Sequence, residues 1–197
     1  MSQTRPFKLV IFDMDGTLID QMLDFEAIRG KLSIPPDEGI LEAIETMSPA
    51  RRTEAEAWLV QTELQAAEKA RLMPGAVETL ASIRNANIKV ALLTRNSRES
   101  MQKVIGKFDL QFDLTWSRED GPIKPEPDGV LRACDTLAVA PEQTACVGDF
   151  QYDLVAANAA GTVSILFAPD QRQKPQFADL ADHVITKLAQ LPALLGI

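Results

Sequence analysis

Short apolar runs alternate with longer stretches of helical spacing along most of the chain. Four runs predict buried strands, because each is only four to six residues long, is mostly apolar and contains β-branched residues. Two weaker strands are expected at residues 114–115 and 183–185. The four main runs are Leu9 to Phe12, Ile88 to Leu93, Thr144 to Val147 and Thr162 to Phe167.

Apolar residues recur every three or four positions between these runs, which predicts helices. Strands that alternate with single helices form right-handed crossovers, and these build a parallel sheet covered on both faces. The predicted fold class is therefore α/β, with a Rossmann-like core of three layers. The helices are expected after Pro74-Gly75 and at residues 97–108, 128–137 and 152–160.

Residues 21–72 interrupt this alternation because they contain no strand-like run. The sequence ILEAIETM, residues 40–47, has helical spacing, and Ser48-Pro49 then predicts the start of another helix. Residues 50–70 add a third stretch in which apolar residues stand among alternating charges. We therefore expect a small helical domain at residues 21–72, inserted into an α/β core formed by residues 1–20 and 73–197.

Composition limits the possible partners. The 197 residues are 46% apolar and 24% charged, which suits a folded protein with one core and a modest insert. The net charge of −8 disfavours nucleic acid and anionic membranes, so an anionic ligand would need a local positive site. No apolar run has the length of a signal or membrane segment, and Cys134 and Cys146 lack a metal or disulfide pattern. We expect a cytoplasmic monomer or homodimer with reduced thiols.

The sequence VIFDMDGTLID, residues 10–20, places acidic residues directly after the first predicted strand. Side chains alternate along an extended segment, so Asp13 and Asp15 should point to one side and Met14 to the other. Gly16 would let the backbone turn or approach a ligand, and the Thr17 hydroxyl would hold a carboxylate. Taken alone, the motif also fits an ordinary acidic turn.

Polar residues follow the other strands as well. Thr94 follows the second run, Asp149 the third, and Lys124 lies in a loop between them. Each has an ordinary explanation: Thr94 as a strand-end residue, Lys124 as a solvated lysine, and Asp149 with Asp153 as a helix N-terminal pair. Because ligands bind at the carboxyl ends of parallel strands, their joint occurrence favours a functional site.

The sequences FDMDGTL, LLTRN, KPEPDG and VGDFQYD occur in this order and resemble the four signature motifs of the haloacid dehalogenase-like hydrolase superfamily. The resemblance covers nearly the whole chain. It is strongest to the phosphoglycolate phosphatase-like and β-phosphoglucomutase-like branch, in which a helical cap follows the first motif. Residues 21–72 are shorter than the larger caps of that branch, which leaves the substrate open.

The resemblance implies roles by position. Asp13 would be the nucleophile that forms an aspartyl-phosphate, and Asp15 the general acid and base. Thr94 would donate a hydrogen bond to the phosphoryl oxygens, and Lys124 would place a positive charge beside them. The substrate-binding residues would be Gly16, Thr94, Arg95, Asn96 and Lys124.

An aspartate that approaches a phosphate dianion meets a repulsion of about 4 kcal/mol per pair of unit charges at 4 Å. A divalent cation with oxygen ligands offsets this repulsion, and Mg²⁺ suits such a site. The resemblance assigns the metal to Asp13, Asp149 and the backbone carbonyl of Asp15. Asp153 would orient a metal-bound water or Lys124.

Asp15 also separates reaction types, because a halide leaves without a proton whereas an alcohol requires one. We therefore expect an enzyme, a Mg²⁺-dependent phosphatase that acts on a small phosphorylated metabolite such as phosphoglycolate or a sugar phosphate. A phosphomutase and a non-catalytic phosphate-sensing or interaction module remain alternatives. A dinucleotide-binding domain is disfavoured, since no G-x-G-x-x-G follows the first strand.

Two arginines of the predicted insert, Arg51 and Arg52, are candidates for contact with a substrate carboxylate. The same stretch is rich in glutamates, and surface helices commonly carry such arginines as solvated partners. We favour the solvated interpretation, in which Arg51 and Arg52 belong to a surface helix rich in glutamates, namely Glu54, Glu56 and Glu63.

Overall fold

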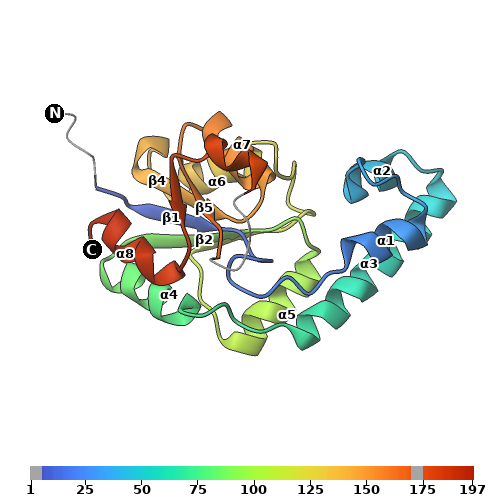
Figure 1. Cartoon of the computed structure of the whole chain (residues 1–197), viewed down its shortest axis with the longest axis horizontal. Helices are drawn as coiled ribbons and strands as arrows, with labels where there is room; N and C mark the ends of the chain where they lie inside the picture. The colour runs from blue at the N-terminus through green and yellow to red at the C-terminus, as the bar shows by residue number, and fades with distance from the viewer. Residues whose placement is uncertain (1–5, 170–174) are drawn as a thin grey trace.

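A six-stranded parallel sheet forms the centre of the molecule in the computed structural model, which describes residues 6–169 and 175–197 (Figure 1). The strand order is β3-β2-β1-β4-β5-β6, and all neighbours are parallel. All four main strands and both weak ones that the sequence predicts are confirmed. They are β1 (Leu9–Phe12), β2 (Lys89–Leu93), β3 (Leu114–Trp116), β4 (Thr144–Gly148), β5 (Val163–Phe167) and β6 (His183–Ile185).

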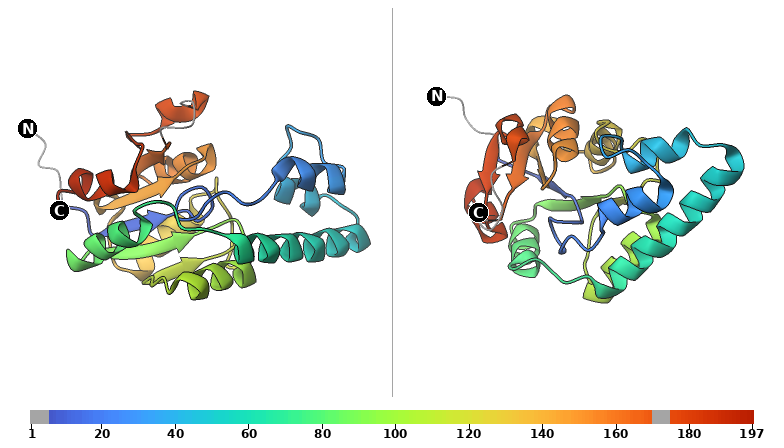
Figure 2. Two further views of the ribbon diagram at one scale, coloured as in Figure 1. Left: turned by 60° about the horizontal axis from the view of Figure 1, so that its bottom comes forward. Right: turned by 45° about the vertical axis from the view of Figure 1, so that its right-hand side comes forward.

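Helices cover both faces of this sheet, which confirms the three-layer α/β fold (Figures 1 and 2). The helices are α1 (Phe25–Leu32), α2 (Ile40–Glu45), α3 (Pro49–Lys69), α4 (Ala76–Asn85), α5 (Arg98–Phe108), α6 (Asp128–Thr136), α7 (Gln151–Ala159) and α8 (Leu191–Leu195), with 3₁₀ turns η1 (Pro141–Gln143), η2 (Gln176–Leu180) and η3 (Leu188–Gln190).

Alternate residues of the central strands β1, β2 and β4 enter different cores. On β1, Val10 and Phe12 join the larger cluster, which α4, α5 and α8 cover, whereas Leu9 and Ile11 join a second cluster with α6 and α7. All four β1 side chains are buried, as expected for the central strand of a parallel sheet. This double burial holds the end of β1 firmly in place.

Helices α1 to α3 lie between β1 and β2 in the chain and pack around an apolar cluster of their own, centred on Ile28, Ile44 and Leu59. The chain leaves and re-enters the α/β body at one place, where two backbone hydrogen bonds join the two segments. The N–H of Asp20 donates to the Arg71 carbonyl at 2.9 Å, and the N–H of Met73 donates to the Leu18 carbonyl at 2.9 Å. Figure 2 shows the long α3 beside α5 and extending beyond the body.

The C-terminal end of α3 is fixed to the body by Lys107 of α5. Its ammonium donates to the carbonyls of Glu68 and Ala70 at 2.6 and 2.7 Å, where the unpaired carbonyls of the helix end attract positive charge. The far end of α3 carries α1 and α2 over the sheet edge. Within the described ranges, no helix has the length and apolar character that a membrane crossing requires.

Candidate active site

The carboxyl edge of the sheet gathers the side chains that the sequence singles out. Asp13 follows β1, Thr94 follows β2 and Asp149 follows β4. The N–H of Asp13 donates to the Val147 carbonyl at 2.9 Å, so the pairing of β1 with β4 sets the position of Asp13. All three site residues line one cavity of about 430 Å³ between the sheet edge and helices α1 to α3.

The predicted alternation after β1 is present. Asp13 and Asp15 line the cavity, whereas Met14 is buried in the larger core. The Thr17 hydroxyl does not hold a carboxylate as expected: it is buried and has no hydrogen-bond partner within the described residues. Thr17 is fully buried and does not line the cavity, so its closeness in sequence to Asp13 and Asp15 did not make it part of the site.

Lys124 connects the loop before α6 to two of the aspartates. Its ammonium donates to Asp13 Oδ1 at 2.6 Å, to Asp153 Oδ1 at 2.6 Å and to the Leu93 carbonyl at 2.8 Å. All three N–H groups are therefore used, and the side chain is 9% exposed. The alternative of a solvated loop lysine is wrong.

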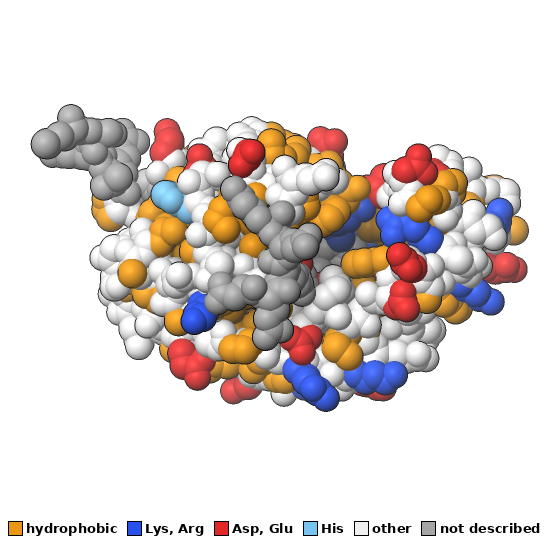
Figure 3. Space-filling view, viewed as in Figure 1, with side chains coloured by type: hydrophobic (Ala, Val, Ile, Leu, Met, Phe, Trp, Pro, Cys, Tyr) orange, Lys and Arg blue, Asp and Glu red, His pale blue; other side chains and the backbone are white. Residues whose placement is uncertain are grey.

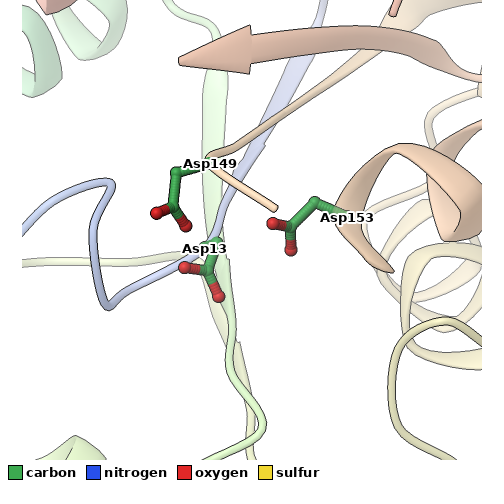
Figure 4. A group of neighbouring side chains, drawn as sticks. All are labelled: Asp13, Asp149 and Asp153. Carbon is green, nitrogen blue, oxygen red and sulfur yellow. The ribbon is translucent and has the colours of Figure 1, made fainter. Parts of the chain in front are cut away.

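Asp13, Asp149 and Asp153 form a compact acidic group (Figure 4). One carboxylate oxygen from each lies within 4.8 Å of the others. Gly16, at φ +80°, lies so close that a Cβ at this position would collide with the Asp149 carboxylate. One lysine cannot neutralise three carboxylates, and hard oxygen ligands are the donors that Mg²⁺ prefers, so the group fits a divalent cation.

Asp15 is oriented from the β2 side. The side-chain amide of Asn96 donates to Asp15 Oδ2 at 2.8 Å, and the N–H of Asn96 donates to the Thr94 hydroxyl at 3.1 Å. Thr94 and Asn96 are both buried and line the cavity. The LLTRN motif therefore lines the cavity and also positions the carboxylate of Asp15.

Burial changes the protonation of these acids. Burial raises the pKa of Asp13 well above its usual value, and nearby carboxylates add to this rise, whereas Lys124 opposes it. Burial raises the pKa of Asp15 to about 7, with further contributions from Glu63 and Asp149. Burial alone would lower the pKa of Lys124, but Asp13 and Asp153 outweigh it and raise the pKa.

Glu63 was wrongly expected on a solvated helix face. It is only 3% exposed, its carboxylate accepts the N–H of Ser97 at 3.0 Å, and it forms an ion pair with Arg118. Ala55, Leu59 and Ala67 are the other buried residues of α3, so Glu63 occupies one position of a stripe with a spacing of four. That spacing was the available signal for its burial.

The arginines take different positions. Arg95 lines the cavity, and its guanidinium donates to both Glu42 carboxylate oxygens at 2.7 and 2.9 Å and to the Lys124 carbonyl. It also lies over the Tyr152 ring, 4.6 Å from its centroid. Arg51 donates to a backbone carbonyl of the insert and Arg52 pairs with Glu56, and neither lines this cavity.

Comparison with known proteins places these motifs in a family context. A family model described as haloacid dehalogenase-like hydrolase matches residues 7–161. A haloacid dehalogenase-like hydrolase domain-containing protein of Arabidopsis thaliana is 32% identical over 202 residues, covering 94% of this chain and 82% of the relative. Hexitol phosphatase B of Escherichia coli K12 is 30% identical over 223 residues and covers both chains completely.

The fold has close structural counterparts. The crystal structure of a predicted phosphoglycolate phosphatase from Haemophilus somnus superposes with a TM-score of 0.73 at 21% identity, covering 95% of this chain and 97% of the other. At this identity the superposition supports the shared α/β fold with its inserted helices.

Lys124→Met should destabilise the metal-free protein by about 3–5 kcal/mol, because it leaves Asp13 and Asp153 buried without a counter-charge. Urea unfolding in EDTA measures the change. Adding Asp153→Asn to Lys124→Met should recover part of the loss. Lys103→Met, which removes only the solvent-screened pair with Glu68, should cost far less. A loss equal to that of this control would contradict the buried pairing.

Asp15→Asn should stabilise the metal-free protein at pH 8 and leave it unchanged below about pH 4. Folding raises the pKa of Asp15 from 3.8 to about 7. Between these pH values the unfolded chain loses the Asp15 proton more readily than the folded chain, so the free energy of unfolding of the wild type falls as the pH rises. The difference should reach roughly 2–4 kcal/mol above pH 7. Urea unfolding in EDTA at pH 4 and pH 8 tests this, and a pH-independent difference would refute it.

Proposed function

The chain belongs to the haloacid dehalogenase-like hydrolase family and is a phosphatase, and we propose that it hydrolyses a small phosphorylated metabolite through an aspartyl-phosphate on Asp13 with Mg²⁺ bound. The observation that carries the proposal is the joint placement of Asp13, Asp15 and Lys124 on one cavity. Each supplies a different requirement of phosphoryl transfer: a nucleophile, a proton and a positive charge.

In the first half of the reaction, a carboxylate oxygen of Asp13 attacks phosphorus while the bond to the leaving oxygen breaks. The Asp15 carboxyl gives its proton to that oxygen, and the alcohol departs. A pKa of about 7 supports this role, because a substantial fraction of Asp15 is then protonated at neutral pH. The Asn96 amide holds Asp15 Oδ2 during the transfer.

In the second half, water attacks phosphorus and gives its proton to Asp15, the bond to Asp13 breaks, and inorganic phosphate leaves. Before the attack, Lys124 favours the ionised form of Asp13 and orients it through the 2.6 Å contact, and Asp153 holds Lys124 from the other side. Thr94, Asn96, Arg95 and Gly16 complete the proposed phosphate surroundings.

Asp13, Asp149 and the backbone carbonyl of Asp15 would hold the Mg²⁺, with Asp153 beside them. When bound, the ion supplies a positive charge that offsets repulsion between the phosphate and the aspartates. We assign residues 21–72 as a cap over a core formed by residues 1–20 and 73–197. The free thiols Cys134 and Cys146 fit a reducing compartment, so we place the enzyme in the cytoplasm.

Asp13→Asn should reduce phosphate release from an aryl phosphate by a factor of about 10³ or more, because an amide is a poor nucleophile and the covalent step is lost. Single-turnover assays with Mg²⁺ measure the loss, and thermal melting verifies the fold. The control Asp135→Asn, at an exposed position of α6, should retain wild-type turnover. Comparable turnover of Asp13→Asn and this control would remove Asp13 from the mechanism.

Chelation should abolish phosphate release, and added Mg²⁺ should restore it. Asp149→Asn should raise the Mg²⁺ concentration needed for half-maximal activity by about tenfold or more, because it removes one charged ligand. A panel of phosphorylated metabolites, with Mg²⁺ or EDTA, provides the measurement. Full activity in EDTA would rule out the metal, and transfer of phosphate to a sugar without release would indicate a phosphomutase.

A further inference from the structure

The cavity above Asp13 has two unlike halves. The half at the sheet edge contains the aspartates, Thr94 and Lys124. The opposite half faces helices α1 to α3, and we call its apolar side chains the apolar wall. Figure 3 shows the molecule hollowed between the α/β body and these helices, with both hydrophobic and basic side chains around the hollow. The apolar wall consists of Leu23, Phe25, Ile28, Ile40, Leu41 and Leu59.

Charged side chains near the apolar wall already have protein partners. Glu63 is engaged by Ser97 and Arg118, and the Arg95 guanidinium is held by both carboxylate oxygens of Glu42. Arg29 donates to the carbonyl of Glu38 through Nε and Nη2, each at 3.3 Å. The acceptor of Arg29 is a neutral carbonyl, so its positive charge stays beside the apolar wall, while the remaining surface that this half offers a leaving group is mainly hydrocarbon.

Aromatic side chains add to this character from two directions. Phe25, at the start of α1, is 42% exposed, and Phe150, before α7, is 45% exposed. Both line the cavity, and the Phe150 ring lies edge-to-face with Tyr152 at 5.0 Å. A bound apolar body would remove both rings from water, and ring–ring contacts would favour an aromatic one.

We propose that the natural substrate is the phosphate monoester of an apolar, ring-bearing alcohol, whose hydrocarbon part lies against the apolar wall. The inference rests on the proposed phosphatase function. A polyol would lose its hydrogen bonds to water along the apolar wall without replacing them. The two arginines that line the cavity, Arg29 and Arg95, already donate to protein acceptors, which leaves fewer donors for a glycolate carboxylate. In hydrolysis, the P–O bond to the ring-bearing alcohol breaks, and Asp15 protonates the departing oxygen.

Three esters of primary alcohols test this preference, because their reacting bonds are alike and only the leaving groups differ in polarity. They are 2-phenylethyl phosphate, phosphoglycolate and sorbitol 6-phosphate. With Mg²⁺ present, kcat/KM for 2-phenylethyl phosphate should exceed each of the others by about tenfold or more. Equal or higher kcat/KM for either polar ester would overturn the inference while leaving the phosphatase function intact. No phosphate release from any ester, nor from phenyl phosphate, would refute both.

Variants of the apolar wall test its location. Leu41→Ser should reduce the ratio of kcat/KM for 2-phenylethyl phosphate to that for phosphoglycolate by about fivefold or more. Leu41 is only partly buried, and Ile40→Ser provides a second variant if the first does not fold. The matched control Met47→Ser alters a partly buried side chain of the same cluster that does not line this cavity. An unchanged ratio in both wall variants, or an equal fall in the control, would contradict the assignment.

Discussion

The buried contact between Lys124 and two aspartates is the constraint on which the site depends. Asp13 and Asp153 come from segments far apart in the chain, and each accepts a 2.6 Å hydrogen bond from the same ammonium. Burying several carboxylates opposes folding, so the surrounding sheet and helices must be stable enough to hold them together. The doubly buried strand β1 supplies this rigidity, because both of its faces are packed in hydrophobic cores.

A separate set of contacts holds the inserted helices over the sheet edge. Helix α3 packs along α5, and Lys107 secures its C-terminal end. The buried pair of Glu63 with Arg118 then fixes the middle of α3 next to the cavity. Farther out, Arg95 and Glu42 link the body to α2 through a more exposed pair. The buried contacts of the insert thus lie along the C-terminal half of α3, next to the α/β body, whereas the contact of α2 over the cavity is more exposed.

The strands of the sheet and the acidic residues of the site were predictable from the sequence, because both follow from local rules. The strands were evident from apolar runs, and the positions of Asp13 and Asp15 followed from side-chain alternation. Glu63 was missed because a glutamate on a charged helix is normally solvated, and its partner Arg118 lies 55 residues away. The engagement of Arg95 by Glu42 was equally invisible, since it depends on how an insert folds back over the body.

Chemistry and substrate selection consequently rest on different parts of the chain. Charged groups at the strand ends are positioned by backbone pairing, which any chain with this sheet and these motifs reproduces. The apolar wall instead comes from α1, α2, α3 and the segment just before α1. Most of its side chains pack in a separate cluster and are free to differ without disturbing the sheet. Similarity to phosphatases therefore supports the reaction far more directly than it supports any particular leaving group.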